Sequence, residues 1–108
     1  MIDLYTWSTP NGRKISILLE ELGIDYNVIP INIIKDEQFD KNFLNISPNN
    51  KIPAIYDHET KISMMESGAI LLYLSEKTGV FHPKKDSDRW KRDEWLMFQM
   101  ASLGPMLG

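Results

Sequence analysis

One stretch decides the fold, and it reads Ser47-Pro48-Asn49-Asn50-Lys51-Ile52-Pro53-Ala54-Ile55. Proline has no backbone N–H and a fixed φ, so Pro53 suits the first residue of a short apolar strand and not its centre. A cis Ile52–Pro53 bond is one option in a tight turn. Such a turn would leave the backbone N–H and C=O of Ile52 available, which predicts an extended, peptide-like ligand.

A second stretch, Glu66-Ser67-Gly68-Ala69-Ile70, places a carboxylate and a hydroxyl where an amphipathic helix is expected to begin. The free N–H groups of a helix N-terminus attract anions, so Ser67 could help to hold a carboxylate while Glu66 pairs with an ammonium. The alternative is a capping box, in which Ser63 caps the helix and Glu66 reaches back. Ser63 falls within an expected strand, which weakens this alternative.

Thr9-Pro10-Asn11 begins the first expected helix. Thr9 as N-cap and Pro10 at the first helical position explain the pattern structurally. In the functional interpretation, Thr9 and Asn11 donate hydrogen bonds to an anion, and the helix field favours a thiolate. The two interpretations are compatible, because a capping hydroxyl can also face a ligand.

Other polar residues carry weaker signals. Gln38 and Lys51 could reach a second carboxylate of a ligand, although such residues are more often solvated. The two histidines, His58 and His82, have no metal-ligand spacing.

Composition narrows the function classes. The 108 residues carry a formal net charge of −3, which disfavours nonspecific binding to nucleic acid or anionic membranes. Cysteine is absent, so any thiol chemistry must use a thiol that the ligand brings. No apolar run has the length of a membrane span, and no targeting segment is apparent. We therefore expect a cytoplasmic protein.

The expected element order is β-α-β-α-β-β-α, an α/β fold with a mixed sheet. We expect a domain over residues 1–79, a linker over 80–87 and a last helix over 88–108. The second half of that helix is apolar nearly all round, as in helices that lie inside a larger helical assembly. This favours either a fragment of a longer protein or an obligate oligomer.

Four motifs in this order resemble one known family. They are T-P-N at 9–11, F-L-x-I-S-P-N at 43–49, N-K-I-P-A-I at 50–55 and E-S-G-A-I at 66–70, with L-G-P-M-L-G at the end of the chain. Together they resemble the glutathione S-transferase N-terminal domain, closest to the nu-class and the glutathione-dependent disulfide-bond reductases. The resemblance implies a thioredoxin-like βαβαββα domain followed by an all-helical domain, of which residues 88–108 would be the beginning.

The resemblance also implies how glutathione would be bound. The backbone of Ile52 would meet its cysteinyl part, with Pro53 cis, and Glu66 and Ser67 would bind its γ-glutamyl end. The remaining implied contacts are Gln38, with Lys51 less certain, near the glycyl end, and Thr9 and Asn11 at the sulfur. Many family members use an N-terminal Tyr, Ser or Cys for the thiol; Tyr5 and Ser8 are nearby here, but the nu-like pattern favours Thr9 and Asn11.

The implied function is a glutathione-dependent transferase or disulfide-bond oxidoreductase with Thr9 and Asn11 as catalytic residues. Glutathione would be the cosubstrate, no metal would be needed, and a small disulfide or electrophile would be the second substrate. Relatives in this family are usually homodimers. The alternative is a non-catalytic binding or regulatory module built on the same fold.

Overall fold

The computed structural model describes residues 1–107, so Gly108, the end of the last predicted helix, lies outside the described residues. The chain divides into two compact units, residues 1–71 and the residues from 72 onward. The predicted domain limits at 79 and 88 stay predictions. None of the described helices has the length and apolar character that crossing a membrane requires.

The first unit is built on a four-stranded mixed sheet with the order β2-β1-β3-β4. The strands are β1 (Ile2–Thr6), β2 (Tyr26–Pro30), β3 (Ala54–Asp57) and β4 (Ile62–Met65). β1 runs parallel to β2 with Ile2 opposite Tyr26, and antiparallel to β3 with Leu4 opposite Ile55. β3 and β4 form a hairpin. With its helices, this sheet confirms the predicted thioredoxin-like α/β class.

Helix α1 (Pro10–Leu22) connects the parallel strands, and its ends follow the sequence signals. Thr9 is the N-cap, and its Oγ1 accepts a hydrogen bond from the N–H of Gly12 at 3.1 Å. Gly23 ends the helix with a φ of 66°, a conformation that glycine adopts easily. Ile15 and Leu19, one turn apart, are fully buried. The expected capping role of Thr9 is therefore confirmed.

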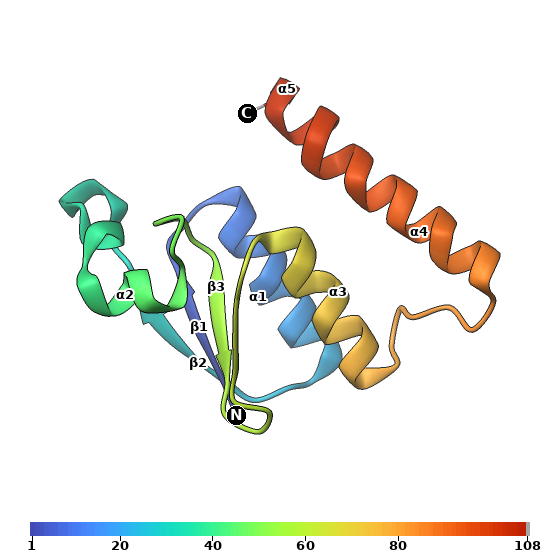
Figure 1. The fold of residues 1–108 in the computed structure, drawn as a ribbon, viewed down its shortest axis with the longest axis horizontal. Coiled ribbons are helices and arrows are strands. Elements are labelled where there is room, and N and C mark those ends of the chain that lie inside the picture. Colours follow the sequence, from blue (N-terminus) through green and yellow to red (C-terminus); the bar gives the residue numbers. More distant parts are fainter. Residues whose placement is uncertain (108) are drawn as a thin grey trace. The chain divides into compact units, whose positions relative to one another are not determined.

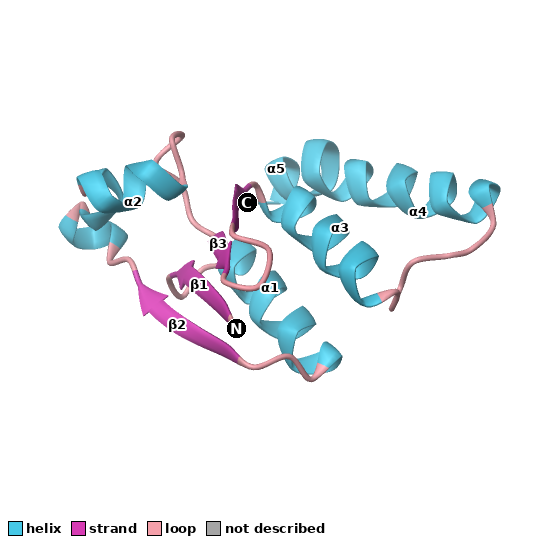
Figure 2. Ribbon diagram, turned by 60° about the horizontal axis from the view of Figure 1, so that its bottom comes forward, coloured by secondary structure: helices cyan, strands magenta, loops and turns pink. Residues whose placement is uncertain are grey.

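The opposite side of the sheet is covered by a short helical region, as Figures 1 and 2 show with α1 and α2 on either side. Its elements are η1 (Ile33–Lys35), η2 (Glu37–Phe39) and α2 (Lys41–Ile46). Phe43 of α2 packs with Ile31 and Ala54 in a small buried cluster that Tyr5, Ile46 and Ile52 flank. This cluster fixes the end of α2 next to the residues that precede β3.

Helix α3 (Ser67–Thr78) begins in the first unit and ends in the second. The second unit continues with α4 (Asp86–Phe98), a π-helical turn at Gln99–Leu103, and α5 (Gly104–Leu107). Two arginines of α4 hold the segment before it. Arg92 donates to the carbonyl of Phe81 at 3.0 Å, and Arg89 donates to the carbonyls of Pro83 and Lys84 at 2.9 and 2.7 Å. A helix thus follows the sheet domain, as predicted, and the segment that leads into it is hydrogen-bonded to that helix.

A first prediction concerns the close approach of α1 to the end of β1. A Cβ placed on Gly12 would clash with Thr6 Oγ1 and lie 2.6 Å from the backbone oxygen of Trp7. Because the backbone oxygen cannot rotate away, Gly12→Ala should lower the free energy of unfolding by about 1–3 kcal/mol. Chemical denaturation measures it. Glu21→Ala, on an exposed position of the same helix, is the control, and equal stability of the two variants would contradict the prediction.

A second prediction concerns Asp3, which contacts His58 Nε2 at 2.7 Å and accepts a hydrogen bond from Asn27 at 3.2 Å. Burial alone would raise the pKa of Asp3, but the two hydrogen bonds and the nearby positive charges together lower it below its ordinary value of 3.8. A lowered pKa in the folded state stabilises the fold above the unfolded-state pKa, and that stabilisation is lost as the pH falls through the folded-state pKa.

The stability difference between the wild type and Asp3→Asn should therefore be largest near neutral pH and shrink in acid. Urea denaturation from neutral pH to below the ordinary pKa of an aspartate measures it. Asp25→Asn, at an exposed position, is the matched control. A difference that does not change with pH would contradict the role of the Asp3 charge.

Candidate functional site

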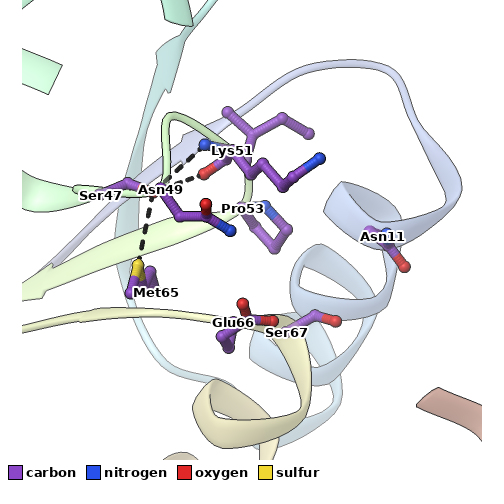
Figure 3. A pocket seen from close by; sticks show the side chains of 9 residues that line it. Asn11, Ser47, Asn49, Lys51, Pro53, Met65, Glu66 and Ser67 are labelled. Atoms are coloured by element: carbon purple, nitrogen blue, oxygen red, sulfur yellow. Dashed lines mark hydrogen bonds between the residues drawn. The ribbon is translucent and has the colours of Figure 1, made fainter. Parts of the chain in front are cut away.

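Most of the predicted residues line one hollow of about 70 Å³ in the first unit. Figure 3 shows its walls, which come from the start of α1, the loop between α2 and β3, and the junction of β4 with α3. The lining residues are Asn11, Ser47, Asn49, Lys51, Ile52, Pro53, Met65, Glu66 and Ser67. Segments far apart in the sequence thus meet at one end of the sheet.

A buried hydroxyl shapes the loop between α2 and β3. Ser47 is completely buried, its N–H donates to the carbonyl of Phe43 at 2.8 Å, and its Oγ donates to the carbonyl of Lys51 at 2.8 Å. The N–H of Asn50 donates to the Ser47 carbonyl at 2.9 Å, and Asn50 has a φ of 52°. These bonds attach the loop to the end of α2 and fix the position of the chain directly before Ile52.

The residue before Pro53 offers its backbone to a ligand. The Ile52–Pro53 peptide bond is cis, as expected. Within the described part of the chain, neither the N–H nor the C=O of Ile52 has a hydrogen-bond partner. An available donor and acceptor on one residue can bind the main chain of an extended peptide, in the manner of an added strand.

The junction between β4 and α3 supplies the second wall. Glu66 has a φ of 73°, an uncommon conformation for a residue other than glycine, and α3 begins at Ser67. Backbone strain of this kind is often found at ligand-binding sites. Ser63 lies inside β4, so the capping-box alternative for Ser63 and Glu66 is excluded. Ser67, the first residue of α3, is buried and lines the hollow.

Opposite charges flank the hollow. Lys51 and Glu66 are both exposed, and Figure 3 shows them on opposite sides of Pro53. No hydrogen bond or ion pair of the Glu66 carboxylate occurs among the described residues. A ligand with an ammonium at one end and a carboxylate at the other matches this charge arrangement.

At the start of α1, Asn11 lines the hollow and Lys14 contacts Asn11. The ammonium of Lys14 donates to Asn11 Oδ1 at 2.8 Å, and partial burial lowers the pKa of Lys14 because desolvation penalises its charged form.

Sequence reasoning missed Lys14, and it missed the structural role of Ser47. The spacing of Asn11 and Lys14, three residues apart on one helix, was a signal that could have identified the pair.

Two predicted contacts do not line the hollow. The Thr9 hydroxyl accepts from Gly12, which leaves its own proton available for donation. Gln38 lies in η2, and its Oε1 is buried without a hydrogen-bond partner among the described residues. The structure thus brings together Asn11, Lys51, Ile52, Pro53, Glu66 and Ser67 but leaves Thr9 and Gln38 outside their cavity. The roles of Thr9 and Gln38 stay predictions.

The alternative residues for a thiol have other surroundings. Tyr5 packs on Phe43 with ring centroids 6.0 Å apart, and burial raises the pKa of its hydroxyl. Ser8 lines a separate, more open hollow of about 250 Å³ near Trp7, Arg13 and Val28. Over the described residues, no cluster of three or more His, Cys, Asp or Glu side chains is arranged to hold a metal ion.

Comparisons with known proteins identify the family of this chain. Residues 1–76 match the family model described as the N-terminal domain of glutathione S-transferase. The chain is 52% identical over 113 residues to the disulfide-bond oxidoreductase YfcG of Escherichia coli K12, covering 100% of this chain and 53% of that protein. The chain therefore spans about half the length of this curated relative.

Solved structures of relatives have the same fold. A glutathione transferase family member from Pseudomonas fluorescens, with two glutathione bound, superposes with a TM-score of 0.91 at 43% identity, over 97% of this chain and 48% of that one. Ure2p in complex with glutathione superposes with a TM-score of 0.90 at 35% identity, over 99% of this chain and 48% of that one. The family match and the shared fold lead to one conclusion: the chain belongs to the glutathione S-transferase family, and residues 1–76 form its N-terminal domain.

Proposed function

We propose that this protein binds glutathione in the hollow between Asn11, Ile52 and Ser67 and stabilises its thiolate for attack on a disulfide or an electrophile. The observation that carries the proposal is the available backbone of Ile52, next to Pro53 and across from the start of α3. Together with the opposite charges of Lys51 and Glu66, this arrangement suits a short, extended peptide with charged ends.

Each part of glutathione has a complementary group. The cysteinyl main chain pairs with the N–H and C=O of Ile52. The γ-glutamyl ammonium pairs with the Glu66 carboxylate, while its carboxylate accepts from Ser67 and the first N–H groups of α3. The glycyl carboxylate lies toward Lys51 and Gln38.

The thiol then lies near the N-terminus of α1, which carries about half a positive charge. A free thiol has a pKa near ~8.5, and a positive field lowers it. Asn11 and Thr9 add neutral hydrogen-bond donors, which stabilise a thiolate more strongly than they stabilise the thiol. The chain has no cysteine, so glutathione supplies the nucleophilic sulfur.

The exchange balances with two glutathione molecules. The first thiolate attacks one sulfur of the disulfide, a mixed disulfide forms, and the other sulfur leaves as a thiolate that takes up a proton. A second glutathione thiolate attacks the glutathione sulfur of the mixed disulfide, which gives glutathione disulfide and releases the second substrate thiol. The substrate is reduced by two electrons and two glutathione molecules are oxidised.

The similar proteins support this proposal. One is named as a disulfide-bond oxidoreductase, and two solved relatives contain glutathione, one of them with two molecules. We extend the proposal to a homodimer of the full-length protein in the cytoplasm. A non-catalytic, glutathione-binding regulatory module is the second candidate. The similarity of the chain to Ure2 proteins, one of them solved with glutathione, favours this candidate, and the tests below include it.

The first test is calorimetric titration of the full-length protein with glutathione and with glutathione disulfide. Ser67→Ala should weaken binding about 10- to 100-fold, because a hydrogen bond to a charged carboxylate is lost. Ser63→Ala, on the exposed part of β4, should bind as the wild type does. Equal affinities of the two variants, each verified as folded, would remove Ser67 from the site.

The second test is glutathione-dependent disulfide reduction. Asn11→Ala should lower turnover about 100-fold, as expected when a donor to a developing anion is removed. Thr9→Ala should also lower it, whereas Thr9→Ser keeps both the cap and the donor and should retain activity. Asn45→Ala, at an exposed position of α2, is the matched control. Unchanged turnover in Asn11→Ala and Thr9→Ala would exclude them from the mechanism, and glutathione binding without turnover in the wild type would favour the regulatory module.

A further inference from the structure

We propose that Lys14 is a positioning residue for the reaction: it holds the Asn11 side chain so that its NH₂ group, and not its oxygen, faces the sulfur of glutathione. This inference rests on the proposed function and adds a residue that the sequence motifs do not include. It concerns whether the ligand contacts the NH₂ group or the oxygen of the Asn11 side chain.

The contact itself assigns the orientation of the amide. Lys14 Nζ lies 2.8 Å from Asn11 Oδ1, and the two residues are three apart on α1. An ammonium carries donors and no acceptor, so the amide oxygen is the only end of Asn11 that can face it. The amide nitrogen must therefore lie on the other side. Figure 3 shows the Asn11 oxygen pointing away from Pro53.

Without this contact, the exposed amide of Asn11 could present either end. The oxygen end would repel a thiolate, whereas the NH₂ end donates to it. A donor that is already oriented needs no rearrangement when the negative charge forms. The contact with Lys14 thus occupies the amide oxygen of Asn11 and leaves its NH₂ group to face the ligand.

The surroundings of Lys14 strengthen the effect. Its side chain is half-buried, so fewer waters screen its charge than at a fully exposed lysine. The hydrogen bond also polarises the amide and makes its N–H groups better donors. The neighbouring cation, Arg13, lines the other hollow and is no substitute for Lys14.

The test uses Lys14→Met, Lys14→Arg and the control Lys61→Met in the full-length protein. Lys61 is an exposed lysine at the end of the β3–β4 hairpin away from the hollow, so its substitution removes the same charge without touching Asn11. The ultraviolet absorbance of the thiolate, followed against pH, gives the apparent pKa of bound glutathione. Steady-state disulfide reduction gives kcat and KM.

Lys14→Met should raise the apparent pKa of the bound thiol and lower kcat roughly tenfold, with little change in KM for glutathione. Lys14→Arg keeps a charged donor and should restore most of the activity. In an Asn11→Ala background, Lys14→Met should have no further effect, because its action passes through the amide. An undiminished effect in that background would overturn the positioning role, as would a wild-type thiol pKa in Lys14→Met.

A measurement without glutathione separates this inference from the proposed function. The side-chain NH₂ signals of Asn11 in ¹⁵N NMR spectra should shift in Lys14→Met and stay unchanged in Lys61→Met. Signals that do not move in Lys14→Met would overturn the contact. Failure of the wild type to bind glutathione in calorimetry, with the NMR shift present, would instead overturn the proposed function and with it the catalytic meaning of the contact.

Discussion

The arrangement of the site depends on one buried hydroxyl. Ser47 is fully enclosed, and its bond to the Lys51 carbonyl turns the chain between the end of α2 and Pro53. The cluster around Phe43 fixes the first end of this turn, and strand pairing of β3 fixes the second. Because a buried hydroxyl without a partner costs about 1–3 kcal/mol, the turn and its hydrogen bond stabilise each other. This turn leads the chain to Ile52, which lines the hollow.

Much of the fold and most of the residues that line the hollow could be predicted from short motifs, because those motifs specify backbone conformation. Proline at position 53 and the helix starts at Thr9 and Ser67 restrict the chain locally. Such restrictions depend on neighbours in the sequence and are therefore visible in it. The structure confirms these local features, while the binding roles of the residues remain proposals.

Three features of the site differ from what the sequence motifs predicted or add to it. Gln38 was predicted as a polar residue that could reach a second carboxylate of a ligand, and the resemblance placed it near the glycyl end; among the described residues its oxygen is buried without a hydrogen-bond partner, and it does not line the hollow. The positive φ of Glu66 arises where a strand passes directly into a helix, and no glycine marks it. Lys14 is different, because its contact with Asn11 lies within one turn of α1 and the spacing of the two residues is visible in the sequence. Only the burial of Gln38 depends on residues brought together by the tertiary fold.

The π-helical turn at Gln99–Leu103 changes how the last helix can be interpreted. A π turn accommodates about one residue more than an α turn, and one residue corresponds to roughly 100° of rotation. Trp95 and Phe98, whose rings meet edge to face at 5.6 Å, precede the turn, and α5 follows it. A stripe of side chains drawn at uniform α-helical spacing is therefore displaced where it passes through Gln99–Leu103. The apolar residues before and within this turn point in directions that a uniform helical projection does not give, so the projection alone does not show that the helix is apolar on every side.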